Sequence, residues 1–129
     1  MATIRKDLRV GRPPGEVWEA FKDVGAIHTR LARGFVTDTK LENGARMVTF
    51  ANGVVARELI VTVDDAGRRL AYAVIESPNL SHHSASFQVF EDGAGARIVW
   101  IADLLPDAAA ETIGAMMEAG VESMRTTLG

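Results

Sequence analysis

The sequence predicts an α+β fold in which a curved, seven-stranded antiparallel sheet wraps around one long C-terminal helix. Seven strand-like stretches are separated by short turn signals, and the end of the chain has the apolar periodicity of a helix. A sheet of this size must bury one face, and the final helix is the only large element that can cover it. Two short helices are expected after the first strand. Residues 1–129 are expected to form a single domain.

The first strand is expected over residues 3–10 and ends at "GRPPGE". The two adjacent prolines cannot donate to a sheet ladder, but proline suits the first turn of a helix. Val17, Trp18 and Phe21 then share one helical face. A second short helix is expected over residues 24–31, so the helical pair lies between the first strand and the rest of the sheet.

Six further strands follow, and their short connections favour antiparallel pairing between neighbours. The Asn-Gly pairs at 43–44 and 52–53 are typical of hairpin turns. The expected strands cover residues 34–41, 46–51, 54–63, 68–76, 81–90 and 97–105.

The chain closes with a helix that begins near Pro106, with Asp107 as its expected N-cap. Gly120 lies midway along this helix, where glycine costs about 1 kcal/mol of helix stability relative to alanine. Such a residue makes sense where another group approaches the helix backbone closely, which favours a cavity. The apolar stripe of the helix consists of Ile113, Met116, Met117, Gly120, Met124 and Leu128.

Composition excludes several classes of function. A net charge of −3 with scattered basic residues gives no reason to expect a nucleic-acid partner. No stretch is apolar enough for a membrane span, and "MATIRKDLRV" lacks the apolar stretch of a signal peptide, so we expect a cytoplasmic protein. The absence of cysteine excludes disulfides and zinc–thiolate sites. No motif indicates a cofactor or a metal, and none is expected.

The order of elements, together with "PPGEVWEAFKD", "ARELIVTVDDAGRRLAYAVIE" and "ARIVWIADLLP", resembles the START-like or SRPBCC superfamily, which has the helix-grip fold. The resemblance covers nearly the whole chain. It implies a hydrophobic cavity between the sheet and the C-terminal helix. Members include polyketide cyclases and aromatases, lipid binders and plant hormone receptors, so the resemblance alone does not determine the function.

Within the superfamily, "RELIVTVDD" through "HHSASFQV" is most similar to the hormone-receptor branch. This similarity implies that Glu58, Tyr72 and His83 face the cavity, with "ESPNLS" at its mouth. The gate loop of the receptors is shortened here to "ANGVV", and the lysine that pairs with a ligand carboxylate has no clear counterpart. Hormone sensing by the receptors' route is therefore not expected.

The adjacent histidines His82 and His83 cannot share one site, because successive strand side chains point to opposite faces. His83 has the parity of the apolar Phe87, which predicts that His83 points inward and His82 outward. An inward histidine can orient a ligand, act as an acid or base near neutral pH, or be a satisfied core residue. His28 is expected either at the cavity mouth or as a cap on the surface.

Two orientations stay open for Glu58. Alternation alone puts Arg57 inside and Glu58 outside, whereas the resemblance puts Glu58 inside, where Arg46 is a possible partner. The apolar face of the alternating pattern consists of Val55, Leu59, Val61 and Val63.

Trp100 has a similar ambiguity. Alternation puts Trp100 inside with Ile98, Ala102 and Leu104, whereas the receptor similarity favours Val99 and Ile101. In the second case Asp103 would face inward.

These observations predict binding of a small hydrophobic organic molecule between the sheet and the C-terminal helix. One alternative is a cyclase or dehydratase, of lyase or isomerase type, using His83 with Glu58 or Tyr72 as acid and base groups. Another is a protein-interaction module with a vestigial cavity. A homodimer would form through an uncovered edge strand or the Trp18 region. The expected cavity residues are Arg46, Val48, Phe50, Glu58, Tyr72, Val74, His83, Ala85, Phe87, Trp100, Met116, Met117, Gly120 and Met124.

Overall fold

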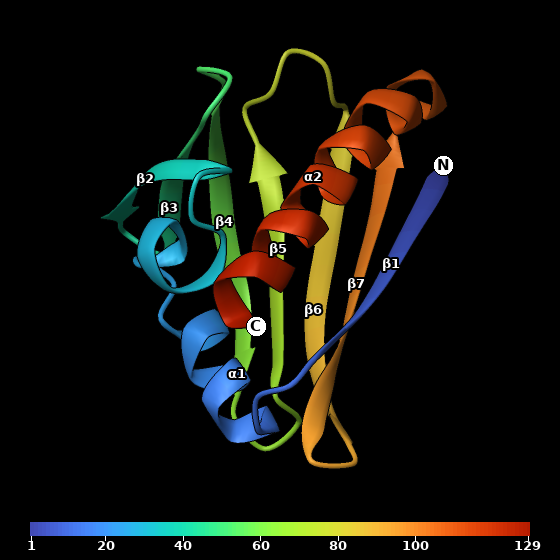
Figure 1. The fold of residues 1–129 in the computed structure, drawn as a ribbon. Helices are drawn as coiled ribbons and strands as arrows, with labels where there is room; N and C mark the ends of the chain where they lie inside the picture. The colour runs from blue at the N-terminus through green and yellow to red at the C-terminus, as the bar shows by residue number, and fades with distance from the viewer.

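The computed structural model describes all residues from 1 to 129 and confirms the predicted fold class. One antiparallel sheet has the strand order β1-β7-β6-β5-β4-β3-β2, so the first strand pairs with the last (Figure 1). The helical elements are α1 (Pro14–Lys22), the π-helical turn η1 (Ile27–Leu31), the 3-10 turn η2 (Asp107–Ala109) and α2 (Ala110–Leu128). The strands are β1 (Ala2–Val10), β2 (Val36–Glu42), β3 (Ala45–Phe50), β4 (Val55–Asp64), β5 (Arg69–Ile75), β6 (His82–Asp92) and β7 (Gly95–Leu105).

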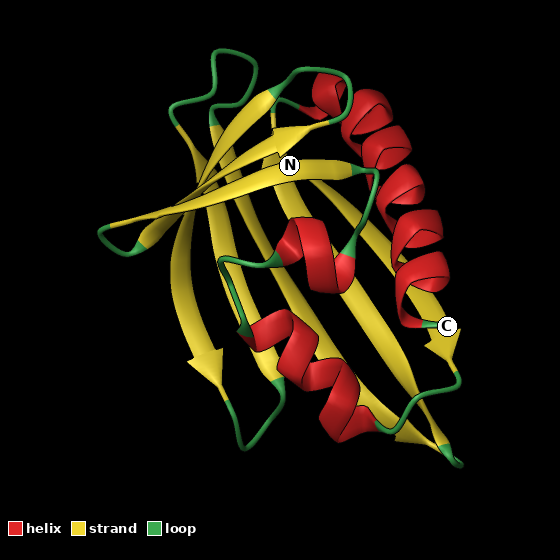
Figure 2. Cartoon of the chain, turned by 60° about the vertical axis from the view of Figure 1, so that its left-hand side comes forward, coloured by secondary structure: helices red, strands yellow, loops and turns green.

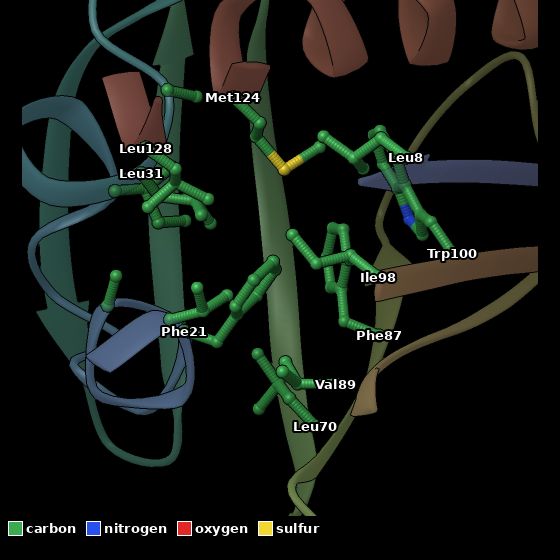
Figure 3. Packing of buried hydrophobic residues seen from close by; sticks show 14 of the residues in the cluster. Leu8, Phe21, Leu31, Leu70, Phe87, Val89, Ile98, Trp100, Met124 and Leu128 are labelled. Atoms are coloured by element: carbon green, nitrogen blue, oxygen red, sulfur yellow. The ribbon is translucent and has the colours of Figure 1, made fainter. Parts of the chain in front are cut away.

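Both α-helices lie on the same, concave side of the curved sheet (Figure 2). Helix α1 fills one end of the concave face, where the Phe21 ring packs against the Phe87 ring at a centroid separation of 4.8 Å. Figure 3 shows Phe21 pointing toward Phe87, next to Leu70 and Val89. These side chains are buried and belong to one hydrophobic core, so helix α1 closes this end of the concave face.

The start of helix α2 differs from the prediction. Asp107 is not the N-cap, because it lies in the short η2 turn that precedes the helix and makes no capping hydrogen bond. Its carboxylate instead pairs with the N-terminal amine of Met1 at 2.9 Å. The second short helix is also shorter than predicted and is a single π-helical turn. None of the helices combines the length and the hydropathy that a membrane span requires.

A β-bulge interrupts strand β4 where it pairs with β5. The register shifts between Ile60 and Thr62, so that Ile60 pairs with Tyr72 but Val63 pairs with the buried Leu70. Directly paired residues share a face of the sheet. An even-numbered residue therefore faces the concave side before the bulge and an odd-numbered one after it, which strict alternation cannot describe.

The bulge decides the orientation of Glu58. The pattern-based interpretation, with Glu58 outside, is wrong: the Glu58 side chain is buried at 7% exposure. The apolar residues that the pattern put inside are instead exposed, with 54% for Val55, 41% for Leu59 and 59% for Val61. The orientation implied by the family resemblance is the one the structure shows.

The close approach of the β6–β7 hairpin to the end of β1 gives a first test of the packing. A Cβ added to Gly95 would overlap the carbonyl oxygen of Val10, which is backbone and cannot rotate away. We expect Gly95→Ala to lower the free energy of unfolding by about 1–3 kcal/mol, measured by urea denaturation.

Gly15→Ala is the matched control, because a Cβ at Gly15 meets no atom within 4 Å and alanine favours the helix. It should be neutral or stabilising. Equal stability of the two variants would show that the hairpin does not approach β1 as described.

A candidate ligand cavity between the sheet and the last helix

A cavity of about 960 Å³ occupies the other end of the concave face, under helix α2. Its size is at the upper end of the range of sites that hold drug-sized molecules. Of its 34 lining residues, 22 are hydrophobic, so the wall is mainly apolar with a few polar groups. The lining comes from η1, from strands β3 to β7, from helix α2, and from the β3–β4 and β5–β6 loops.

All of the cavity residues expected from the sequence line this cavity except Ala85. Ala85 is buried in the floor of the sheet between its pairing partners Tyr72 and Ala102, and its short side chain does not reach the cavity surface. His28 is absent from the lining, so of its two expected positions the one at the cavity mouth is wrong. Its Nδ1 lies 3.1 Å from the Thr39 hydroxyl.

Sequence reasoning missed the lining supplied by irregular segments. Ile27, Leu31 and Phe35 come from η1 and the chain after it, and no periodicity extends into that region. The β5–β6 loop was expected at the mouth from the family resemblance, and residues 76–80 do line it. Ile113 belonged to the predicted apolar stripe, so its place in the wall could have been inferred.

The most polar part of the wall is a buried ion pair. Arg46 on β3 and Glu58 on β4 are direct cross-strand partners, and Arg46 Nε donates to Glu58 Oε1 at 2.8 Å. Arg46 is only 2% exposed, and its guanidinium also lies 5.4 Å from the centre of the Tyr72 ring. A second nitrogen of Arg46 donates to the carbonyl of Val24 at 3.4 Å. The pair therefore compensates its own charge inside an apolar wall.

An aromatic group forms the floor of the cavity. The ring of Phe87 stacks with that of Trp100 at a centroid separation of 4.6 Å and with that of Tyr72 at 5.8 Å. Trp100 Nε1 donates to the hydroxyl oxygen of Tyr72 at 3.0 Å. Burial and the nearby Glu58 raise the pKa of Tyr72 far above its ordinary value of 10, so the hydroxyl keeps its proton near neutral pH.

For β7 the alternating pattern is the correct guide. Trp100 is buried and lines the cavity, so the receptor-based interpretation that favoured Val99 and Ile101 is wrong. Asp103 faces away from the cavity, where it accepts a hydrogen bond from the Thr3 hydroxyl at 2.6 Å. Strand β7 carries no register shift against β6 or β1, so strict alternation holds along its length.

His83 replaces a backbone acceptor in the sheet. The pairing of β5 with β6 ends at Tyr72 and Ala85, and beyond it the backbone N–H of Val74 donates to Nδ1 of His83 at 3.1 Å. A neutral imidazole that accepts at Nδ1 carries its proton on Nε2. Burial lowers the pKa of His83 below its ordinary value of 6.5, and the nearby His82 lowers it further. The neutral, Nε2-protonated ring is therefore the form that the site favours near neutral pH.

His82 lies on the opposite face of β6 and is exposed, with its Nε2 3.4 Å from the Ser84 hydroxyl. The two rings therefore cannot act on one ligand or hold one ion together.

Gly120 lets two aromatic rings approach helix α2. A Cβ at this position would lie 3.1 Å from the Trp100 ring and 3.2 Å from the Phe35 ring. Met117 and Met124 on the same face are buried, whereas Met116 is only partly covered and lies beside the opening near Phe50. The small residue at the middle of the helix thus brings the aromatic floor and the helix into contact.

The rim of the cavity carries a second set of charges. Arg57 lies 3.6 Å from a carboxylate oxygen of Glu42 and 3.4 Å from one of Glu76. Glu76 begins the β5–β6 loop with a φ of 57°, in the left-handed region that non-glycine residues rarely adopt. Arg57 therefore ties this loop to strands β2 and β4 at the mouth.

Several solved structures share the architecture of this chain. A protein called XoxI from Bacillus cereus matches with a TM-score of 0.88 and 16% identity, over 99% of this chain and 96% of that one. A START superfamily protein from Mycobacterium smegmatis matches with a TM-score of 0.80 and 8% identity, over 98% and 96%. The di-domain aromatase/cyclase BexL of the BE-7585A biosynthetic pathway matches with 0.78 and 18%, over 98% of this chain and 46% of that one.

These likenesses show the fold, which is the START-like helix-grip fold that the sequence resembles. No curated protein matches the chain by sequence. The model of the family described as "Polyketide cyclase / dehydrase and lipid transport" matches residues 1–129, and the chain belongs to that family.

The buried ion pair gives a test of the cavity wall. We expect Arg46→Met to lower the free energy of unfolding by about 3–5 kcal/mol, because it leaves Glu58 buried without a compensating charge. Adding Glu58→Leu should recover most of that loss, since the double variant buries no charge. Urea denaturation of the two single variants and the double variant measures both effects.

The exposed pair Arg30–Asp23, at 2.9 Å, is the matched control, and Arg30→Met should cost less than about 1 kcal/mol. Losses that simply add in the double variant would mean that Arg46 and Glu58 do not interact.

The lowered pKa of His83 predicts a pH dependence of stability. The unfolded chain takes up a proton at this residue more readily than the folded one, so the free energy of unfolding falls as the pH drops below 6.5 toward the folded pKa. Above pH 6.5 the contribution is constant. The difference in stability between about pH 8 and pH 5.5 should therefore shrink in His83→Gln, whereas His82→Gln should keep most of it, because burial is the larger cause of the lowered pKa. The same pH dependence in both variants would count against the buried position of His83.

Proposed function

We propose that the protein binds a small, largely apolar organic molecule in the cavity between the sheet and helix α2. The observation that carries the proposal is the cavity itself: about 960 Å³, an aromatic floor, methionines on the helix, and few polar groups. Sites of this composition hold ligands through apolar contact, while a small number of polar groups set the orientation. Membership of a family whose description includes lipid transport supports the same function.

A second function, a cyclase or dehydratase, is supported by the other half of that description and by the polar groups of the wall. His83 and the Tyr72 hydroxyl lie on neighbouring strands with ring centres 5.8 Å apart. Both can donate a hydrogen bond to a carbonyl oxygen, and Glu58 is the nearby carboxylate. In this function the Nε2–H of His83 and the hydroxyl of Tyr72 polarise the carbonyl.

Native mass spectrometry of the freshly purified chain identifies what occupies the cavity. An added mass that disappears on denaturation would give the ligand class directly. The two functions then differ in the fate of that compound. A binding protein returns it unchanged, whereas a dehydratase returns a product that has lost one molecule of water.

A cavity-filling substitution tests the location of binding. We expect Met116→Trp to weaken the binding of the neutral, apolar dye N-phenyl-1-naphthylamine at least about tenfold, because the indole would occupy the opening beside Phe50. Dye fluorescence on titration measures the affinity, and far-UV circular dichroism checks that the variant is folded.

Val61→Trp is the matched control, because Val61 is exposed outside the cavity. It should bind the dye as the unmodified protein does. Unchanged binding in Met116→Trp, or equal losses in both variants, would place the dye outside the cavity and count against the proposed function.

A further inference from the structure

Two polar side chains of the cavity wall, His83 and Tyr72, are placed to donate hydrogen bonds to a ligand. His83 has one ring nitrogen occupied, since Nδ1 accepts from the backbone of Val74. Its Nε2–H has no acceptor in the protein, yet the Nε2 atom is not fully buried. Because His83 lines the cavity, this N–H is open to it. A neutral ring in this arrangement can only donate at Nε2.

Tyr72 also has a hydrogen-bond donor without an acceptor in the protein. Its oxygen accepts from Trp100 Nε1, and no group of the protein accepts the proton of its hydroxyl. The raised pKa of Tyr72 keeps that proton in place. Tyr72 is only 5% exposed and lines the cavity, so an acceptor for this proton would have to reach it through the cavity. Buried donors without an acceptor cost free energy, which an acceptor on a ligand would recover.

The charges that line the cavity cancel. Two arginines, Arg46 and Arg57, face two carboxylates, Glu58 and Glu76, and each arginine lies within 4 Å of one of them. A carboxylate ligand would therefore lose its hydration without meeting an unpaired cation, and Glu58 would repel it. A cationic ligand would meet donors instead of acceptors at His83 and Tyr72.

We infer that the ligand is an apolar molecule carrying a neutral oxygen acceptor, a ketone, ester or amide carbonyl, which accepts hydrogen bonds at the His83–Tyr72 side of the cavity. The inference rests on the proposed function and adds the polarity of the group that is recognised. Val74 and Trp100 contribute indirectly: Val74 occupies the one acceptor nitrogen of His83, which leaves this ring only a donor, and Trp100 occupies a lone pair of the Tyr72 oxygen, whose hydroxyl proton remains to be donated.

Three compounds with one tricyclic skeleton test this polarity on the unmodified protein: fluorene, fluorenone and fluorene-9-carboxylate. Fluorenone should bind about tenfold more tightly than fluorene, since it gains one or two hydrogen bonds. The carboxylate should bind more weakly than fluorene. Quenching of tryptophan fluorescence gives the affinities, and a lowered infrared stretching frequency of the bound ketone reports the hydrogen bond.

Substitutions identify the donors. Tyr72→Phe and His83→Phe should each bring the ratio of the fluorenone and fluorene affinities closer to one. His83→Gln should keep the ratio, because an amide can accept from Val74 and donate to the ligand. His82→Phe is the matched control on the outward face, and it should keep the ratio as well.

The outcomes separate the inference from the proposed function. Equal affinity for fluorene and fluorenone, or tightest binding of the carboxylate, would overturn the inference while leaving a ligand cavity in place. Binding of none of the three compounds would contradict the proposed function, and the inference with it. A preference for fluorenone that survives both phenylalanine substitutions would also overturn the assignment to His83 and Tyr72.

Discussion

The concave face of the sheet has to be covered, and the two helices cover it unequally. Helix α1 packs its aromatic side chain directly onto the sheet, through Phe21 against Phe87. Helix α2 touches the aromatic floor closely at Gly120, where no side chain intervenes. Toward the start of α2 the helix carries flexible methionines, and the strands on either side end in loops. The cavity follows from this difference, because the part of the face that neither helix fills is enclosed by the loops.

An apolar cavity that also contains charge needs that charge to be internally compensated. The cross-strand register of β3 and β4 places Arg46 directly opposite Glu58, so the ion pair is set by the backbone pairing as well as by the side chains. The bulge in β4 is what makes this possible. It lets the strand present Glu58 to the cavity and still bring Val63 opposite the buried Leu70. A strand without the extra residue could not place both Glu58 and Val63 on the concave face, because one is even-numbered and the other odd-numbered.

The sequence predicted the strands, the long helix and part of the cavity wall, because periodicity and turn residues are local signals. Orientation was predictable where alternation is uninterrupted, as for Trp100 on β7. It was not predictable by pattern for Glu58, because a bulge is a property of two paired strands and leaves no mark in one of them. The family resemblance succeeded at Glu58 and failed at Trp100. The contacts of Asp107 and His28 were not predictable from local patterns. Asp107 pairs with the N-terminal amine of Met1, and His28 lies within hydrogen-bond distance of Thr39.

His83 has two roles in this structure, and they are linked. Its ring closes the sheet where the β5–β6 ladder ends, by accepting the hydrogen bond that a backbone carbonyl would otherwise take from Val74. That same bond determines which nitrogen carries the proton and so what the ring offers the cavity. An apolar side chain at position 83 would leave the N–H of Val74 without this acceptor. A histidine without the bond from Val74 could carry its proton on either ring nitrogen. The end of the β5–β6 pairing therefore turns the backbone N–H of Val74 into the group that orients the His83 ring, so that its Nε2–H is the nitrogen left for the cavity.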